Sequence, residues 1–112
     1  MVSEFNSRSN KIAICAEKNC EKRVEIASLT KIMTCILIIN LADKLKLNIK
    51  QEKLIINEKA AKMPGTSAQL GYSDTLTVYE ALHGLMLPSG NDAATALGHW
   101  GGKMIRKYCS II

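Results

Sequence analysis

A serine and a lysine stand three residues apart in the segment Ser28-Leu29-Thr30-Lys31. On a helix, residues with this spacing share a face, and their Cβ atoms lie about 5–6 Å apart. Ser28 comes at a predicted helix start, where unpaired backbone N–H groups favour a developing negative charge. Lys31 would point into apolar surroundings, where desolvation favours the neutral amine. The pair therefore fits a serine nucleophile beside a general base. An N-capping serine followed by a lysine that reaches solvent fits the same spacing.

A second segment with reactive side chains, Ser89-Gly90-Asn91-Asp92, follows a proline. On its own it is a corner between two helices, in which Asn91 or Asp92 caps the second helix. Such a corner also places the hydroxyl of Ser89 and the amide of Asn91 side by side at the rim of a cleft. Together with the serine–lysine pair, these two side chains complete a candidate site.

The serine–lysine pair lies on a long apolar helix that we expect from residue 28 to residue 46. Apolar residues recur there at three- and four-residue steps and also fill much of the opposite face. A helix that is apolar nearly all round belongs in the middle of a fold. Ser28 stands at its start, where the hydroxyl can cap backbone N–H groups.

The corner joins two further predicted helices. The first begins at Thr77, which fits a capping box with Glu80, and ends at Pro88. The second covers Ala93–His99 and stops at Gly101-Gly102. The corner is therefore the turn between two helix ends.

Short extended segments complete the predicted elements. Lys11–Glu17 is rich in β-branched and apolar residues and predicts a strand, with a second extended piece near Val24–Ala27. Lys53–Asn57 is a third candidate strand, and residues 58–75 carry the proline, glycine and serine residues of a loop. The sequence therefore predicts a mixed α+β fold.

Composition limits the classes of function. The chain has 112 residues, enough for one domain, and a net charge of +5. Its lysines alternate with acidic residues, as on a solvated surface, so we do not expect nucleic-acid binding. No apolar run reaches the length of a membrane span, and Met1–Asn10 lacks the apolar core of an export signal. No compartment is assigned.

The chain has four cysteines, at positions 15, 20, 35 and 109. Without an export signal we expect them to be free thiols, and Cys35 to be a small core residue. Their spacing, and that of His83 and His99, does not fit a zinc site.

Three segments resemble, in order, the motifs of the serine D-alanyl-D-alanine carboxypeptidases, the low-molecular-mass penicillin-binding peptidases. Ala27–Thr34 resembles the nucleophile block, Gly65-Thr66-Ser67 a small-residue loop, and Leu85–Ala94 the second block. The similarity runs from about residue 11 to residue 102. It suggests a polar tail at 1–10, the amino-terminal part of a catalytic domain at 11–102 and a divergent basic tail at 103–112.

The resemblance implies an acyl-serine mechanism that uses no metal and no organic cofactor. Ser28 would attack the carbonyl between the terminal D-alanines of a peptidoglycan stem peptide, and its backbone N–H would be one oxyanion donor. Lys31 would take the serine proton. Ser89 would relay that proton to the departing D-alanine, while Asn91 would bind the substrate amide and hold Lys31 in place. β-Lactams mimic the same dipeptide and would trap Ser28.

One family motif has no counterpart in this sequence. The third motif, lysine-(threonine or serine)-glycine on a later strand, is absent, since Gly101-Gly102-Lys103 has the wrong order. The missing strand would supply a second oxyanion N–H and a carboxylate-binding lysine. The resemblance thus implies a truncated chain with an incomplete β-lactamase/transpeptidase-like fold, its helices packed on a partial antiparallel sheet.

Two interpretations of function therefore stay open. The first is a serine-type D-Ala-D-Ala carboxypeptidase that acts on stem peptides and β-lactams. The second is a catalytically inactive remnant, or a partner-binding fragment, of the same family. Without a full sheet, one side of the helix at 28–46 should face water, so we expect marginal stability or self-association through exposed apolar surface.

Overall fold

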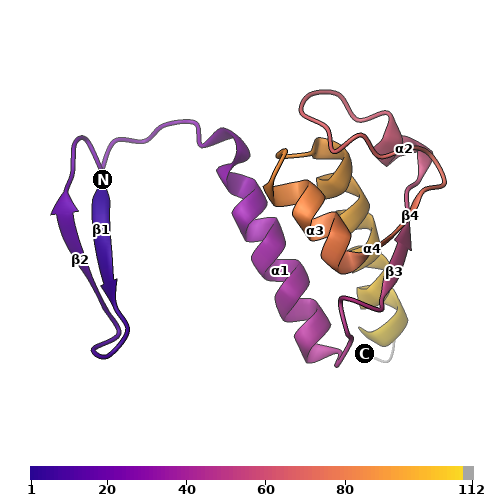
Figure 1. Cartoon of the computed structure of the whole chain (residues 1–112), viewed down its shortest axis with the longest axis horizontal. Coiled ribbons are helices and arrows are strands. Elements are labelled where there is room, and N and C mark those ends of the chain that lie inside the picture. The colour runs from indigo at the N-terminus through magenta and orange to yellow at the C-terminus, as the bar shows by residue number, and fades with distance from the viewer. Residues whose placement is uncertain (110–112) are drawn as a thin grey trace.

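The computed structural model describes residues 1–109, in which helices alternate with two small antiparallel sheets (Figure 1). In chain order the elements are β1 (Val2–Asn6), β2 (Lys11–Ala16), the 3₁₀ turn η1 (Ala27–Leu29), α1 (Thr30–Lys44), β3 (Lys53–Ile55), α2 (Glu58–Ala61), β4 (Thr75–Thr77), α3 (Val78–Met86) and α4 (Asn91–Cys109). The α+β class that the sequence predicts is confirmed.

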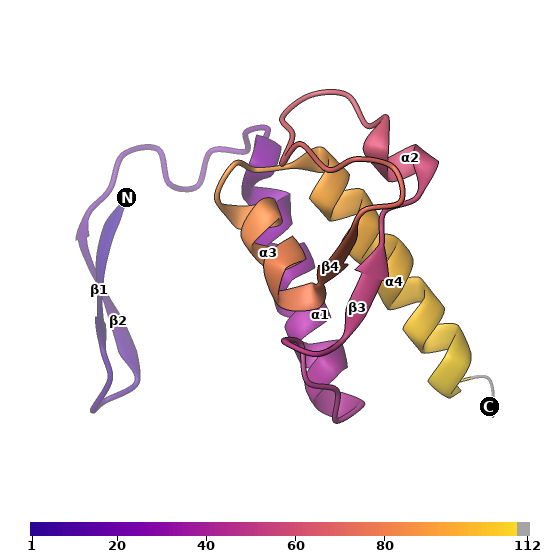
Figure 2. The same ribbon diagram turned by 45° about the vertical axis from the view of Figure 1, so that its right-hand side comes forward.

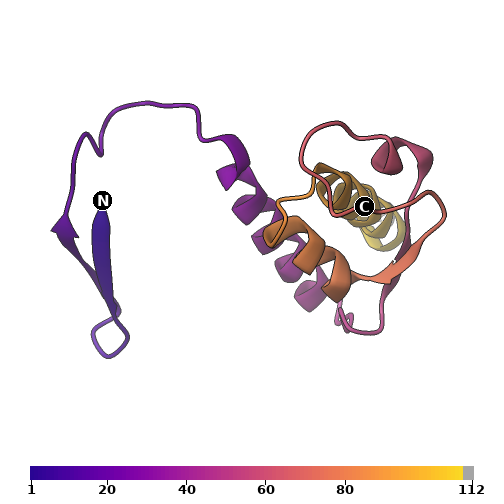
Figure 3. The same cartoon turned by 45° about the horizontal axis from the view of Figure 1, so that its top comes forward.

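The core lies among three helices and one pair of strands. Helices α1, α3 and α4 pack against one another (Figure 2), and β3, β4 and α2 lie on the side of α4 away from α1 (Figure 3). β3 and β4 pair antiparallel, with Leu54 opposite Leu76. The buried apolar residues of this core are Ile38, Ala42, Leu54, Ile56, Ala60, Val78, Ala81, Leu82, Leu85, Ala93, Ala96, Leu97, Trp100 and Met104.

α1 is the predicted apolar helix, and only one of its sides is buried. Ile38 and Ala42 face the core, with 5% and 2% of their surface exposed, whereas Leu37 is 59% exposed. The expectation that one side of this helix faces water is confirmed. Because the core covers only one face, the apolar residues of the other face remain at the surface.

Ser28 does not cap α1, so that prediction is wrong. It lies in η1, ahead of the helix, and the N-cap position of α1 is Leu29, whose side chain makes no cap hydrogen bond. The hydroxyl of Thr30 instead donates to the Ala27 carbonyl (3.2 Å). The hydroxyl of Ser28 lies near the amine of Lys31 rather than over the backbone N–H groups.

The predicted capping box at the start of α3 is confirmed. The Thr77 hydroxyl accepts a hydrogen bond from the Glu80 N–H (3.1 Å), and the Glu80 carboxylate accepts one from the Thr77 N–H (2.8 Å). The backbone hydrogen bond from Thr77, followed by that from its hydroxyl, lowers the pKa of Glu80. α3 ends at Met86, two residues before Pro88, as the proline predicts.

α4 runs through the two glycines that were expected to end it. The predicted helix stops at His99, whereas α4 extends from Asn91 to Cys109. A Cβ on Gly101 would lie 3.1 Å from Ile38 Cδ1, so this glycine lets α4 approach α1 closely. Burial of Trp100 and Met104 beside it outweighs the weak helix propensity of glycine. Most of the predicted basic tail, 103–109, therefore belongs to α4, and residues 110–112 lie outside the described residues.

The first two strands form a hairpin that stands apart from the helices in all three views. β2 confirms the strand predicted at Lys11–Glu17, and β1 lies in the segment 1–10 that was expected to be a polar tail. All residues of both strands are exposed. The hairpin and the β3–β4 pair are separate, so the described residues do not form the single partial sheet expected beneath the helices.

Two other segments differ from expectation. Val24–Ala27 does not form a strand, because it has no partner strand within residues 1–109 and stays exposed up to η1. The predicted loop at 58–75 contains the short helix α2, whose start is capped by Asn57 through the Ala60 N–H (2.8 Å). The strand predicted at Lys53–Asn57 is confirmed as β3.

The four cysteines are unpaired thiols, and Cys35 packs against the core. Within residues 1–109, no helix combines the length and the apolar composition needed to cross a bilayer.

Candidate active site

Three of the four predicted site residues meet at the amine of Lys31. This side chain is buried, with 8% of its residue surface exposed. Its Nζ lies 3.5 Å from Ser28 Oγ and 3.0 Å from Ser89 Oγ. It also donates a hydrogen bond to the Ser89 carbonyl oxygen (2.5 Å). The start of α1 and the turn before α4 therefore form one polar cluster, although Lys31 and Ser89 are 58 residues apart in the sequence.

Both segments that contact the amine contain a residue in the left-handed backbone region. Ser89 has φ 58° and Ala27, next to Ser28, has φ 45°. Residues with a Cβ rarely adopt this conformation, and each instance costs on the order of 1–3 kcal/mol. The conformation of Ser89 is the one in which its carbonyl and its hydroxyl both reach Lys31. The surrounding contacts must therefore hold this corner in place.

The fourth predicted residue, Asn91, contacts a different segment. Its Nδ2 donates to the Pro64 carbonyl (2.8 Å), and its backbone N–H donates to the Thr66 carbonyl (2.7 Å). The structure gives no hydrogen bond between Asn91 and Lys31. Asn91 therefore ties the corner to residues 64–66, and its expected role in holding Lys31 stays a prediction.

Asp92, in the first turn of α4, binds the loop at 67–70, and the sequence did not reveal its importance. The sequence suggested only a helix cap here, yet this residue is 1% exposed. Its carboxylate accepts a hydrogen bond from the Ser67 hydroxyl (2.7 Å) and from the N–H groups of Ala68 (2.9 Å) and Leu70 (3.1 Å). It also accepts one from its neighbour Ala93 (2.8 Å). The signal that could have found it is an acidic residue directly after the corner, facing a small-residue loop.

The pKa of Asp92 reflects two opposed effects. Burial acts to raise the pKa of this carboxyl, but the hydrogen bonds from Ala68, Ser67, Leu70 and Ala93 lower it and prevail. The net pKa lies below the ordinary value for aspartate. The charged carboxylate is therefore the form that fits this pocket of donors.

Gly90 allows the corner to approach the loop at 66–70. A Cβ at this position would lie 2.5 Å from Asp92 Oδ1 and 2.9 Å from both the Ala68 nitrogen and the Gly84 oxygen. Its own N–H donates to the Gly84 carbonyl (3.0 Å). Only a residue without a side chain fits between these groups.

This arrangement has the parts of a nucleophile and its base. Ser28 is exposed, so a substrate can reach its hydroxyl, and the amine of Lys31 lies behind it with a second hydroxyl at hand. Within residues 1–109 there is no cluster of histidine, cysteine and acidic side chains that could hold a metal ion. The Ser28–Lys31 pair has the hydroxyl and the amine that proton transfer from a serine nucleophile requires.

Comparison with known proteins agrees with this chemistry. Residues 5–104 match the family model of D-alanyl-D-alanine carboxypeptidases. The chain belongs to the D-alanyl-D-alanine carboxypeptidase family. It is also 40% identical, over 83 residues, to D-alanyl-D-alanine carboxypeptidase DacF of Bacillus subtilis (strain 168). That alignment covers 74% of this chain but only 21% of DacF, so the chain spans about a fifth of the relative's length.

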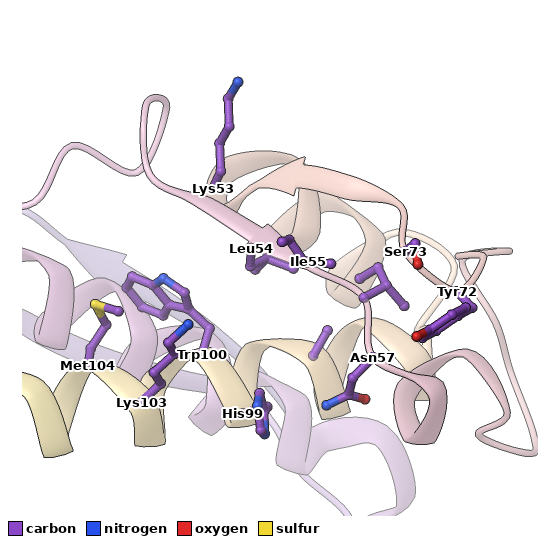
Figure 4. A pocket seen from close by; sticks show the side chains of 12 residues that line it. Lys53, Leu54, Ile55, Asn57, Tyr72, Ser73, His99, Trp100, Lys103 and Met104 are labelled. Atoms are coloured by element: carbon purple, nitrogen blue, oxygen red, sulfur yellow. The ribbon is translucent and has the colours of Figure 1, made fainter.

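One pocket of this carboxypeptidase-family chain lies away from the candidate site. It measures about 360 Å³ and lies between β3 and α4, where Trp100 and Met104 face Leu54 (Figure 4). None of the four predicted site residues lines it. The indole Nε1 of Trp100 is buried there without a hydrogen-bond partner in the described part of the chain. This pocket is therefore separate from the candidate site.

Proposed function

We propose that this chain carries the acylation machinery of a serine-type D-Ala-D-Ala carboxypeptidase. The single observation that supports the proposal best is the buried amine of Lys31, which lies between the hydroxyls of Ser28 and Ser89. An amine in this position can accept a proton from one hydroxyl and pass it on through the other. Family membership supports the same reaction class.

The proposed reaction has two chemical steps. Ser28 Oγ attacks the carbonyl carbon between the terminal D-alanines of a stem peptide while Lys31 Nζ accepts its proton. The C–N bond breaks, Ser89 Oγ relays the proton to the departing amine, and D-alanine leaves. Water then attacks the acyl-serine ester and regenerates Ser28. Asn91 binds the substrate amide, and the backbone N–H of Ser28 stabilises the oxyanion.

The fold is proposed to be the amino-terminal part of the β-lactamase/transpeptidase-like fold. This proposal is supported by the α+β class and by motifs in the family's order, while the third motif is absent from this sequence.

The test is covalent labelling by fluorescent penicillin, read by the intact mass and by the mass of the Ser28 peptide. We expect one label per chain, absent in Ser28→Ala and retained in Ser9→Ala, which removes an exposed hairpin hydroxyl. Lys31→Met should slow labelling by about 10²-fold or more, because the general base is lost. A folded wild-type chain that takes up no label would contradict the proposal and favour the inactive remnant.

A second proposal, self-association, rests on exposed apolar residues of η1 and α1. This surface comprises Leu29, Ile32, Met33, Ile36, Leu37 and Ile39, each at least 44% exposed. Contiguous apolar surface of this kind marks interaction sites. We expect the elution volume of the chain to fall with rising concentration, and Ile36→Gln to reduce this dependence. Elution as a monomer at every concentration would contradict the proposal.

A further inference from the structure

The carbonyl oxygen of Ser89 accepts two hydrogen bonds at the centre of the candidate site. One comes from the amine of Lys31 (2.5 Å) and the other from the hydroxyl of Thr66. A carbonyl oxygen has two lone pairs and can only accept, so these two donors fill its capacity. The position of this oxygen is therefore set jointly by Lys31 and by Thr66.

The Ser89 carbonyl also determines the orientation of the N–H groups on the Lys31 amine. In the neutral form that the proposed acylation requires, this amine has two N–H donors and one lone pair. One N–H must point at the Ser89 carbonyl, because that group cannot donate. The second N–H and the lone pair are then left for the two hydroxyls, Ser28 Oγ at 3.5 Å and Ser89 Oγ at 3.0 Å. An amine held in this way presents its lone pair to a serine hydroxyl, as a general base requires.

Thr66 belongs to a segment that other contacts hold in place. Its carbonyl accepts the Asn91 N–H (2.7 Å), and the carboxylate of Asp92 binds the Ser67 hydroxyl and the N–H groups of Ala68 and Leu70. The side chain of Thr66 itself is exposed. The segment is therefore held in place by backbone hydrogen bonds and by Asp92. From this position the Thr66 hydroxyl donates to the Ser89 carbonyl.

We propose that Thr66 is a positioning residue: its hydroxyl holds the carbonyl of the left-handed Ser89 so that the amine of Lys31 faces the Ser28 hydroxyl, and Asp92 fixes the segment that carries Thr66. The effect of Thr66 on reaction rate rests on the acylation function proposed above. The effect of Thr66 on the position of the Lys31 amine does not depend on that function.

The test compares Thr66→Val, which keeps the side-chain shape but removes the hydroxyl, with Thr66→Ser, which keeps the hydroxyl. We expect Thr66→Val to slow labelling of Ser28 by penicillin about threefold to tenfold, as one lost hydrogen bond predicts, and Thr66→Ser to stay within twofold of wild type. Because the Thr66 side chain is exposed, both variants should fold, with Thr66→Val only slightly less stable than the wild type through the loss of one hydrogen bond. Equal rates in all three chains, or an equal loss in both variants, would overturn the proposal.

A second measurement does not depend on acylation. Acetylation by N-hydroxysuccinimide acetate reports how strongly each lysine amine is held, with exposed Lys18 as the internal reference. We expect Lys31 to react several-fold faster in Thr66→Val than in wild type, and Thr66→Ser to match wild type. Unchanged reactivity of Lys31 in Thr66→Val would overturn the positioning role. If wild type takes up no penicillin but Lys31 responds in this way, the acylation proposal fails and the positioning role stands.

Discussion

The corner before α4 and the hairpin β1–β2 are opposite cases within one chain. At the corner, Asp92 is 1% exposed and its carboxylate accepts hydrogen bonds from residues more than 20 positions earlier in the chain. In the hairpin every strand residue is exposed, including Phe5 (59%) and Ile12 (69%). The conformation of the corner is thus determined by contacts within the chain, whereas the hairpin is held only by its own strand pairing.

This difference indicates where the chain is preorganised. Ser89 keeps a left-handed backbone, φ 58°, because Thr66, Lys31 and the close fit at Gly90 surround it. An isolated two-stranded hairpin is only marginally stable in water. Groups proposed for catalysis therefore lie where stabilising contacts are dense, and stability measurements on the two regions should differ sharply.

The largest effect is expected from Asp92→Ala. The change removes the acceptor of three N–H groups, that of buried Ala93 and those of half-buried Ala68 and Leu70. We expect the free energy of unfolding to fall by about 3–5 kcal/mol, measured by urea denaturation. Asp43→Ala, which removes an exposed aspartate on α1, is the control and should stay within about 0.5 kcal/mol of wild type. Similar stabilities for the two variants would remove the claim that Asp92 locks the corner.

The dependence of stability on pH provides a second test of Asp92. Because the folded-state pKa of Asp92 lies below its unfolded value of about 3.9, its charged form stabilises the fold above that pH. This contribution is lost as the pH falls through the folded-state pKa. Urea midpoints of the wild type should therefore decline below about pH 4, and those of Asp92→Asn should decline less. Parallel curves would show that Asp92 is not a source of the acid sensitivity.

Two adjacent residues of α1 allow its buried and exposed sides to be compared. Ile38 is 5% exposed and Leu37 is 59% exposed. Ile38→Ala opens a cavity in the core and should cost about 2–4 kcal/mol of unfolding free energy, while Leu37→Ala should cost less than about 0.5 kcal/mol. Equal losses would mean that the outer side of α1 is also covered in solution, as self-association predicts at high concentration.

The glycines offer a smaller contrast. Gly90→Ala forces a Cβ to within 2.5 Å of Asp92 Oδ1, so we expect a loss of about 1–3 kcal/mol. Gly98→Ala on α4 meets nothing within 4 Å and should instead stabilise the helix by up to about 1 kcal/mol. Thermal melts of both variants measure the difference. If both substitutions changed the stability in the same direction, the close fit at Gly90 would be contradicted.

Local sequence signals predicted some of these features and missed others for physical reasons. The capping box at Thr77 and the serine–lysine spacing act within one helical turn, so the sequence alone was sufficient for them. The continuation of α4 through Gly101 depends on Ile38, which is distant in sequence, and the burial of Asp92 depends on the donors at 67–70. Non-local contacts of this kind leave no local pattern, which is why the role of Thr66 emerges only in three dimensions.

The smallest effect is expected from removal of the hairpin. Deletion of residues 1–16 removes two strands whose side chains are all exposed and that stand apart from the helices. The deletion uncovers no buried apolar residue. The free energy of unfolding of the remaining chain, measured by urea denaturation, should therefore change by less than about 0.5 kcal/mol. Leu54→Ala in β3, which is 5% exposed, is the contrasting change in the other strand pair and should cost several times more. A large loss on deletion would mean that the hairpin docks on the helical part in solution, and the contrast between a self-sufficient corner and an unsupported hairpin would no longer hold.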